Sequence, residues 1–491
     1  MASPGGRQGA PAGFARPRRS ATLTHGPHGR CAVAVIRRAV ALHSTVSTAA
    51  WLFAHDWDLR ALTRLGAARP VRFVRAGFDL FSFPGNLALA RFDLEAFADR
   101  LAARGRRAGW RAVLSHHEHF GALAAAMVAE RLGLPGASPE SIVAAQHKLH
   151  TRRVLQQIAP AASLPFQDVA MSPTEALPPD LRFPAFAKPV KGVFSVLARR
   201  VDNAAELQRH LALSRAERWL AHRLIEPFER VRRVRLPAAG STHRMLIEQP
   251  VPLAVPQFNL DGWVRDGRVH ALGVVDAVTV PGTQAFLRWE VPSRLPPAVQ
   301  ARALALAQRL LAALGYRHGC FNLEFFYDAA ADRLTAIELN PRLASQFGDL
   351  YRRVRGVDPH AIALALALGE DPLQLPPAEP TAQVAASLVY RAFTPAAVPR
   401  APDRRRRAAL HAAFADAELH CFTRQGRALA RDLRWTGSHR YGVLHLGARD
   451  WGELRQRAER ASALLGWPAP YADAAPATAH CGWRAAVAAT T

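Results

Sequence analysis

The chain has 491 residues, of which 49% are apolar and 21% are charged, a composition typical of a folded protein of more than one domain. Its four cysteines are scattered with no C-x-x-C pair, which argues against a zinc site or a disulfide framework and suits the reducing cytoplasm. No apolar run reaches the roughly 18 residues that a membrane span needs, so we expect no membrane partner.

The net charge of +25 raises the question of a nucleic-acid partner. Most arginines stand singly along helix-like segments, and only "RPRRS" near the start and residues 404–407 form runs. No zinc finger and no aromatic-interleaved basic ribbon accompanies them. The pattern therefore favours a solvated, arginine-biased surface, with a basic nucleic-acid-binding protein as the alternative.

The first part of the chain divides into a tail and a small domain. Residues 1–44 are rich in Gly, Pro, Ala and Arg, which predicts a flexible basic tail. Over 45–140, short apolar runs alternate with amphipathic helical patterns, which predicts a parallel α/β domain. The expected strands are 71–74, 87–90 and 111–115, and the expected helices are 93–105 and the alanine-rich segment that ends at Gly133.

Residues 141–372 predict a larger domain. A helix at 141–159, a proline-rich loop at 160–184, strands on either side of a loop at 190–195, a helix at 203–213 and a strand at 244–249 come first. A hairpin over 258–280 follows, with its turn at Arg265-Asp266-Gly267. A helix at 297–314, a second hairpin, "CFNLEFFYD" with "LTAIELN", and a helix at 358–368 complete this domain.

The proline-rich segment 371–380 marks a boundary. Beyond it, strands at 382–395 and 441–447 and a helix at 450–465 predict a smaller α+β module over 373–470, and 471–491 is expected to be loose. The fold class is therefore α/β and α+β.

The second hairpin carries the clearest chemistry. Asn322 and Glu324 lie two residues apart on one strand face, as do Glu338 and Asn340 on the other strand. A short loop would place Glu324 opposite Glu338, and buried carboxylates that face each other repel unless a cation joins them. Oxygen ligands at this spacing suit magnesium, and Arg342 follows where it could bind a phosphate or carboxylate. The alternative is an exposed acidic hairpin.

Lysine occurs only at Lys148, Lys188 and Lys191, and every other basic residue is arginine. A lysine that survives in this background suggests chemistry that needs a compact ammonium. Lys188 ends an apolar strand just before a loop with Gly192 and Ser195, a plausible phosphate clamp. Taken alone, Lys148 and Lys188 could equally be surface residues. Glu248 ends another strand before a proline-containing connector that could act as a hinge.

In this order, the features over roughly 70–370 resemble the ATP-grasp superfamily, in its carbamoyl-phosphate-synthase-like, carboxylate–amine ligase branch. The upstream "VLSHHEHFGALAAAMVAERLGLPG" resembles the pre-ATP-grasp domain of that branch. The resemblance implies that residues 141–372 form a two-lobed ATP-grasp core, with a small lobe over about 184–250. It also implies an enzyme that uses ATP and Mg²⁺ (or Mn²⁺) to activate a small-molecule carboxylate as an acyl phosphate for attack by an amine. A homodimer is left open.

Site roles follow from the resemblance by position. It implies that Lys148 and Lys188 bind the phosphates and that the loop 190–195, which includes Ser195, closes over them. Lys191, which the family pattern does not demand, would be an extra donor on this loop. Backbone at Gln249 and Val251 would hold adenine with Glu248 facing its amino group, and Glu324, Glu338 and Asn340 would hold the metal. Arg342 would steady the transferred phosphoryl group. Gln257 stands where many members carry a ribose-binding glutamate, and Gln346 stands where biotin carboxylases carry a glutamate, which argues against carboxylation with that base.

Other candidates are weaker. Arg288 could bind a phosphate or a substrate carboxylate, or lie at the surface, and Asp276 is less favoured. The run from His116 to His119 is interpreted as a loop at the end of a strand rather than a metal site, because adjacent residues do not face one way. The functional alternatives are another ATP-grasp activity, by phosphotransfer or carboxylation, and the basic nucleic-acid-binding protein.

Overall fold

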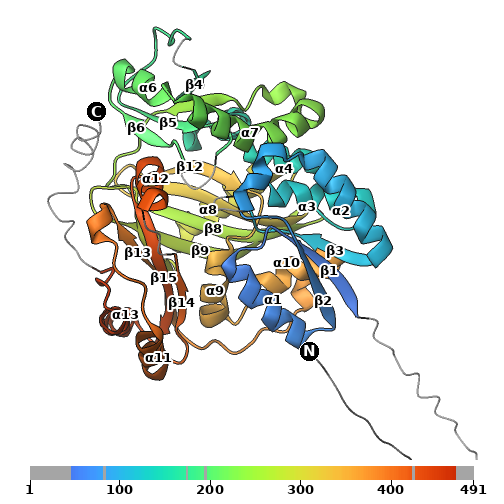
Figure 1. The fold of residues 1–491 in the computed structure, drawn as a ribbon, viewed down its shortest axis with the longest axis vertical. Helices are drawn as coiled ribbons and strands as arrows, with labels where there is room; N and C mark the ends of the chain where they lie inside the picture. Colours follow the sequence, from blue (N-terminus) through green and yellow to red (C-terminus); the bar gives the residue numbers. More distant parts are fainter. Residues whose placement is uncertain (1–45, 81–84, 173–174, 193–195, 423–425, 472–491) are drawn as a thin grey trace, which may run out of the picture. The chain divides into compact units, whose positions relative to one another are not determined.

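The computed structural model describes residues 46–80, 85–172, 175–192, 196–422 and 426–471. Three sheets account for the strands of this part of the chain (Figure 1). The predictions for the tail, 1–44, and for most of 471–491 lie outside the described residues.

The first sheet is parallel, in the strand order β2-β1-β3, as expected for an α/β domain. Apolar side chains of the helices that alternate with its strands pack against it, as in α3, which is buried along most of its length. The elements are β1 (Ser47–Leu52), α1 (Asp56–Ala68), β2 (Val71–Ala76), α2 (Leu94–Ala108), β3 (Trp110–Leu114) and α3 (Gly121–Leu132).

One predicted strand of this domain is wrong. Residues 87–90 lie within a 3-10 helix, Gly85–Arg91. Leu87 is exposed and Leu89 is buried, so a tight helical turn produces here the alternation of exposed and buried apolar residues that a strand would also produce. A run of four residues is too short for its pattern to distinguish the two structures.

The predicted helix at 141–159 is two helices, α4 (Pro139–Gln146) and α5 (Lys148–Ile158). His147 between them has an extended backbone, and its ring accepts a hydrogen bond from the backbone N–H of His150, so it acts as the N-cap of α5. The break leaves Lys148 at the first position of α5.

The second sheet has four antiparallel strands in the order β4-β7-β5-β6. Its first strand lies within the predicted proline-rich loop at 160–184, so the sheet starts before the lobe boundary expected at about 184. The long helix α7 was not predicted, although Ser214 and Glu217 form a capping box at its start. The elements are β4 (Phe166–Ala170), β5 (Ala185–Pro189), β6 (Arg199–Val201), α6 (Ala204–Leu211), α7 (Arg215–Arg235) and β7 (Arg244–Glu248).

The third sheet has eight antiparallel strands in the order β12-β11-β8-β9-β10-β13-β15-β14. Both predicted hairpins are confirmed: β8 and β9 turn at Asp266 and Gly267, both with positive φ, and β11 pairs with β12. The elements are β8 (Gln257–Arg265), β9 (Arg268–Thr279), β10 (Phe286–Val291), α8 (Pro297–Ala313), β11 (Gly319–Asp328), β12 (Arg333–Asn340), α9 (Gly348–Arg355) and α10 (Pro359–Leu368).

The C-terminal strands extend this same sheet, because β13 pairs with β10. The module therefore shares a continuous sheet with the residues before the proline-rich boundary. Its elements are β13 (Val384–Ala392), α11 (Arg404–Ala413), β14 (Glu418–Cys421), α12 (Gly426–Thr436), β15 (His439–Ala448) and α13 (Trp451–Leu465).

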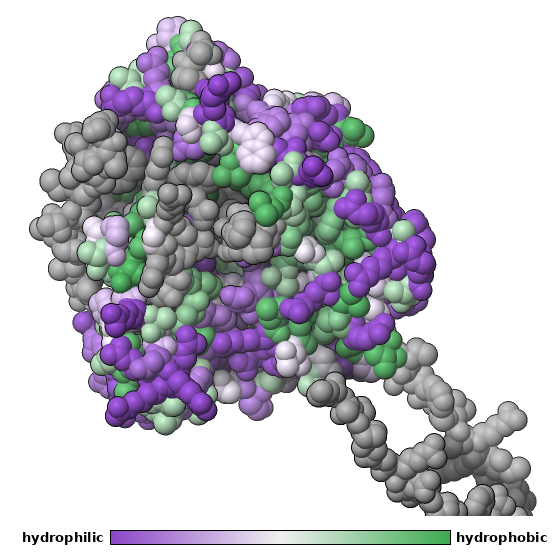
Figure 2. All heavy atoms as spheres, viewed as in Figure 1, coloured by the Kyte–Doolittle hydropathy of each residue, from purple (hydrophilic) through white to green (hydrophobic). Residues whose placement is uncertain are grey.

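Of the two arginine runs in the sequence, 404–407 lies within the described residues, and it is exposed to solvent. Arg404 to Arg407 lie exposed on α11. Figure 2 shows hydrophilic residues gathered at the lower left, where Figure 1 places α11 and α13. Among the described helices, none has the length and apolar character required to cross a membrane.

Two glycines that end helices provide a matched test of packing. Gly356 ends α9 and Gly109 ends α2, both in the left-handed conformation. A Cβ at position 356 would lie 1.7 Å from the carbonyl oxygen of Ala378, whereas one at position 109 would meet no atom within 4 Å.

We expect Gly109→Ala to lower the free energy of unfolding by about 1 kcal/mol, the cost of a left-handed alanine. Gly356→Ala should cost at least about 2 kcal/mol more, because the backbone of the segment that leads to β13 must move. Urea denaturation of both variants measures the difference, and equal losses would contradict this packing.

Candidate functional site

The predicted pairing of the two acids is present. In the β11–β12 hairpin, Glu324 lies opposite Glu338, and Asn322 lies opposite Asn340. A bulge follows directly after Glu324, which accommodates Ile337 without disturbing this pair. Two carboxylates and a carboxamide therefore lie on one strand face, as the sequence spacing predicts.

A chain of hydrogen bonds fixes these side chains. The amide of Asn340 donates to Glu324 Oε1 (3.1 Å), and the amide of Gln257 donates to Glu324 Oε2 (2.9 Å). Behind them, Asn322 donates to Asp261 (2.9 Å), which also accepts from the Tyr351 hydroxyl (2.9 Å). Burial raises the pKa of Asp261 to about 7.

The two opposed carboxylates differ in their environment. Lys148 Nζ lies 2.8 Å from Glu338 Oε2. Burial would raise the pKa of Glu338, but the charges of Lys148 and Lys188 lower it below its ordinary value. Burial and the nearby charge of Glu338 raise the pKa of Glu324. The pair is thus stable with one carboxylate ionised, and a further cation would be required to hold both as anions.

Arg342 is held by a residue of the first domain. Its Nη2 lies 2.6 Å from Glu118 Oε2, in the loop after β3. Glu118 and Glu338 line the same pocket, together with Lys148 and Asn340. This contact brings the N-terminal domain to the carboxylate cluster.

Lys188 belongs to a buried ion-pair group. Its Nζ lies 2.7 Å from Glu248 Oε2, and Arg152 Nη2 lies 2.5 Å from Glu248 Oε1. Arg152 also donates to the carbonyl oxygens of Ala336 and Ile337, so it connects this group to β12. The carboxylate of Glu248 is therefore occupied by two cations, and does not stand free to face an adenine amino group as the resemblance implied.

Lys191 is almost fully buried, with 2% of its surface exposed. Its Nζ donates to Gln146 Oε1 (2.8 Å) and lies 4.6 Å from the ring centroid of Phe228. Burial lowers its pKa to about 7, and the charges of Lys148 and Arg342 act in the same direction. The loop that follows includes Ser195, whose predicted phosphate contact lies outside the described residues.

The predicted hinge backbone lies just after β7. The N–H of Gln249 donates to the carbonyl oxygen of Pro165 (3.0 Å), which leaves its carbonyl for a ligand. The N–H of Val251 makes no hydrogen bond to another described residue. These two groups could still bind the edge of a base, which stays a prediction.

The structure does not bring Arg288 into the cluster. Arg288 pairs with Glu290 (2.7 Å), and its guanidinium lies 4.4 Å from the ring centroid of Tyr471. Asp276 accepts hydrogen bonds from Ser293 and from the backbone N–H of Arg294. Both residues are satisfied by their neighbours, so their predicted roles at the reaction centre gain no geometric support.

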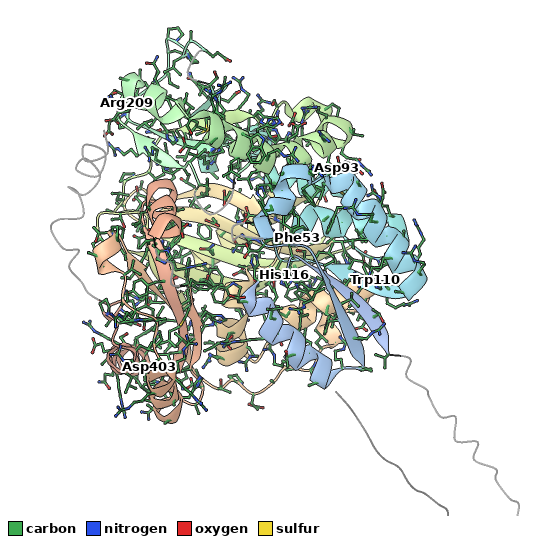
Figure 3. All side chains as sticks on the ribbon, viewed as in Figure 1. Phe53, Asp93, Trp110, His116, Arg209 and Asp403 are labelled. Carbon is green, nitrogen blue, oxygen red and sulfur yellow. The ribbon has the colours of Figure 1, made fainter. Side chains whose placement is uncertain are left out.

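The histidine run after β3 lies in a loop, as interpreted from the sequence. His116 Nδ1 lies 3.0 Å from the buried Asp58, which His360 Nε2 also contacts (3.2 Å). These contacts join α1, the β3–α3 loop and α10. Figure 3 labels His116, and Phe53 after β1, in the central region where these elements meet.

The carboxylate cluster fits a hard divalent cation. Its donors are oxygens, and burial together with the charge of Glu338 raises the pKa of Glu324, although the charges of Arg342 and Lys148 oppose this shift. Glu324, Glu338 and Asn340 would supply the ligands. Asn340 would need to turn its amide, because its nitrogen now faces Glu324.

Three residues of this site were missed from the sequence. Glu118 was set aside with the histidines, and Arg152 and Gln146 resemble ordinary helical residues. Gln146 donates to the carbonyl oxygen of Glu118 (2.5 Å) and accepts from Lys191. Only Glu118 had a sequence signal, and it was weak: an acid in a loop at the C-terminal end of a predicted strand. Arg152 and Gln146 carry no such signal in the sequence.

Comparison with known proteins gives one curated relative and many solved structures. The chain is 31% identical over 295 residues to carnosine synthase 1 of Gallus gallus, a match that covers 57% of this chain and 29% of that protein. The chain thus spans less than a third of the curated relative that it matches. No family model matches the chain.

The solved structures share the fold over most of their length. An L-amino acid ligase from Bacillus licheniformis superposes with a TM-score of 0.60 at 17% identity, over 84% of this chain and 96% of that one. A carboxyaminoimidazole ribonucleotide synthase from Aspergillus clavatus, complexed with ATP, gives 0.58 at 16%, over 86% and 98%. A biotin carboxylase from Campylobacter jejuni gives 0.55 at 16%, over 85% and 91%. The chain has the ATP-grasp fold.

The pKa of Lys191 has a consequence for stability. Since the folded state lowers this pKa from 10.5 to about 7, the unfolded chain binds more protons between these values, and stability rises with pH across this window. Below pH 7 Lys191 is charged in both the folded and the unfolded chain, so the destabilisation caused by burying its ammonium is present in full.

Lys191→Met should therefore be more stable than the wild type at pH 7, and the gain should shrink by roughly 2–4 kcal/mol toward pH 10. Urea unfolding of both proteins across this range measures it. A pH-independent difference would show that Lys191 titrates as an ordinary lysine.

Proposed function

We propose that the chain is an ATP- and magnesium-dependent ligase that activates a carboxylate as an acyl phosphate and transfers the acyl group to an amine. The observation that carries this proposal is the opposed Glu324 and Glu338, with Lys148 paired to Glu338 and Arg342 close enough for its charge to lower the pKa of both acids. Carboxylates and cations gathered in this way suit a metal-bound polyphosphate.

The cations of the cleft would bind and position the phosphates. Lys148 and Lys188 would contact them after partial release from Glu338 and Glu248, and Lys191 would add a third ammonium. Arg342 would leave Glu118 to steady the phosphoryl group in transfer. Positioning and charge neutralisation provide most of the rate enhancement for this chemistry.

The reaction balances in two steps. A carboxylate oxygen of the substrate attacks the γ-phosphorus, and the bond to ADP breaks. The amine nitrogen then attacks the acyl carbon, phosphate leaves with its electron pair, and the amine loses a proton. A magnesium ion bound by Glu324, Glu338 and Asn340 would neutralise charge on the phosphate oxygens.

The remaining residues of the cleft would have supporting roles. Arg152 would keep Glu248 in place against Lys188, and Gln257 would orient Glu324. The carbonyl of Gln249 and the N–H of Val251 would bind adenine. The chain would comprise a pre-ATP-grasp domain over 45–140, an ATP-grasp domain over 141–372 and a C-terminal module over 373–470.

The solved structures with this fold support an ATP-dependent ligase. One is an L-amino acid ligase, and the synthase structure is a complex with ATP. Gln346, where a carboxylating enzyme would need a glutamate, donates to Ser387 Oγ (2.8 Å) and offers no base.

Glu338→Ala should lower substrate-dependent ADP release by roughly a hundredfold or more, because the variant loses a ligand of the metal and the partner of Lys148. Asp328→Ala, at the partly exposed far end of β11, is the matched control and should retain wild-type turnover. ADP release with pairs of carboxylic acids and amines measures both variants.

Hydroxylamine as the acceptor tests the chemistry itself. A ligase traps the acyl phosphate as a hydroxamate, whereas a phosphotransferase to a hydroxyl group produces ADP without one. Wild-type turnover in Glu338→Ala, or ADP release that never produces hydroxamate, would contradict the proposed function.

A further inference from the structure

Two arginines lie directly opposite each other in the C-terminal part of the large sheet. Arg391 of β13 pairs in register with Arg440 of β15, next to a bulge that follows Tyr390. Like charges at opposed positions of adjacent strands destabilise a sheet, so this arrangement needs a compensating partner.

The described residues supply no such partner. Arg391 donates from Nε to the carbonyl oxygen of Phe286 (3.2 Å) and from Nη1 to Ser438 Oγ (2.9 Å). Arg440 lies over the ring of Phe422, 4.7 Å from its centroid. Neither guanidinium forms an ion pair with a carboxylate among the described residues.

Arg353 of α9, which lies beside the start of β13 and so at the opposite end of that strand from Arg391, shows how a structural arginine is held next to this module. It pairs with Asp349 (2.5 Å) and Asp416 (2.7 Å), and both acids hold its guanidinium in place. By contrast, burial lowers the pKa values of Arg391 and Arg440 to about 10, and Asp56 opposes this only weakly for Arg440. Two opposed cations that have no acidic partner among the described residues are a ready receptor for an anion.

The arginine pair lies on the side of the sheet that faces the first domain. Trp57 of α1 packs against Phe422, with ring centroids 5.9 Å apart, and against His420, 4.2 Å apart. Just before α1, His55 stacks on His117, with ring centroids 5.0 Å apart. The next residue after His117 is Glu118, which contacts Arg342 (2.6 Å), so the start of α1 connects the side of the sheet that carries Arg440 to the reaction centre.

Both arginines are also reachable by a ligand. Each is only partly buried, so solvent contacts part of each side chain. Arg440 forms no hydrogen bond to a described residue, so its guanidinium presents a complete set of donors. Its planar fork suits a carboxylate in particular, which it can bind through two parallel hydrogen bonds.

We propose that Arg391 and Arg440 bind the carboxylate of the amine-bearing substrate, so that the acceptor is an amino acid held with its amine toward Arg342. The role of this substrate as the acceptor rests on the proposed ligase function, whereas the anion site itself does not depend on that function. It assigns the C-terminal module the selection of one substrate class: amines that carry a carboxylate.

Calorimetry on the full chain with Mg·ADP tests the site without turnover. The probes are the standard L-amino acids, each compared with its primary amide, which keeps the amine and side chain but removes the negative charge. For the amino acid that binds best, the acid should bind about ten- to a hundredfold more tightly than its amide.

In Arg440→Gln the acid and the amide should bind equally weakly, and Arg440→Lys should restore part of the preference. The exposed Arg405→Gln on α11 is the matched control and should keep the wild-type ratio. Because Arg440 has no described carboxylate partner, Arg440→Gln should unfold at the same temperature as the wild type or higher.

Several outcomes would overturn the site: no amino acid binds, the wild type binds acid and amide equally, or Arg440→Gln loses stability while it keeps the acid preference. Inorganic phosphate is the competing anion. If phosphate binds in an Arg440-dependent manner and amino acids do not bind, the proposed site is also overturned. Hydroxamate formation separates the two proposals. If hydroxamate forms but the protein shows no preference for the acid over the amide, only the acceptor site is contradicted. If the acid preference depends on Arg440 but no hydroxamate forms, only the ligase function is contradicted.

Discussion

The register of one hairpin determines how this site is built. Glu324 and Glu338 lie opposite each other on the same face, so their mutual repulsion must be balanced by whatever surrounds them. In the chain alone, Lys148 neutralises Glu338, while the amides of Asn340 and Gln257 solvate Glu324. Arg342, one residue beyond the proline that follows Asn340, is neutralised by Glu118.

These pairs leave the cleft with a set of cations and a set of carboxylates that neutralise each other. Every cation that we propose to bind phosphate, apart from Lys191, is paired with a carboxylate within 2.8 Å. A metal ion on the carboxylates and a polyphosphate on the cations would exchange these internal pairs for external ones. The metal ion alone would leave the buried cations without partners, and the polyphosphate alone would leave the buried carboxylates without partners.

The sequence predicted the parts of this arrangement that depend on local geometry. The two-residue spacing in "NLE" and "ELN", with a short connection between the strands, was sufficient to predict the opposed acids. The rarity of lysine pointed to Lys148, Lys188 and Lys191, and all three lie near the carboxylates. Strand 87–90 and the unbroken helix at 141–159 were wrong, because a four-residue run and a single extended histidine leave no clear periodicity.

What depends on contacts between distant segments could not be predicted. Glu118 reaches Arg342 across more than 200 residues of sequence, and Arg391 meets Arg440 only because β13 and β15 are neighbours. In a chain with so many arginines, nothing local distinguishes Arg440 from a surface residue. Its lack of a carboxylate partner among the described residues becomes visible only in the folded chain.

Nucleotide and metal should therefore bind as one unit to a cleft whose charges are paired internally. Calorimetric titration of ATP into the wild-type protein, in magnesium and in EDTA, measures this coupling. We predict that magnesium tightens ATP binding by at least about tenfold, with the reciprocal effect of ATP on metal affinity. ATP that binds equally well or better without the metal would contradict it.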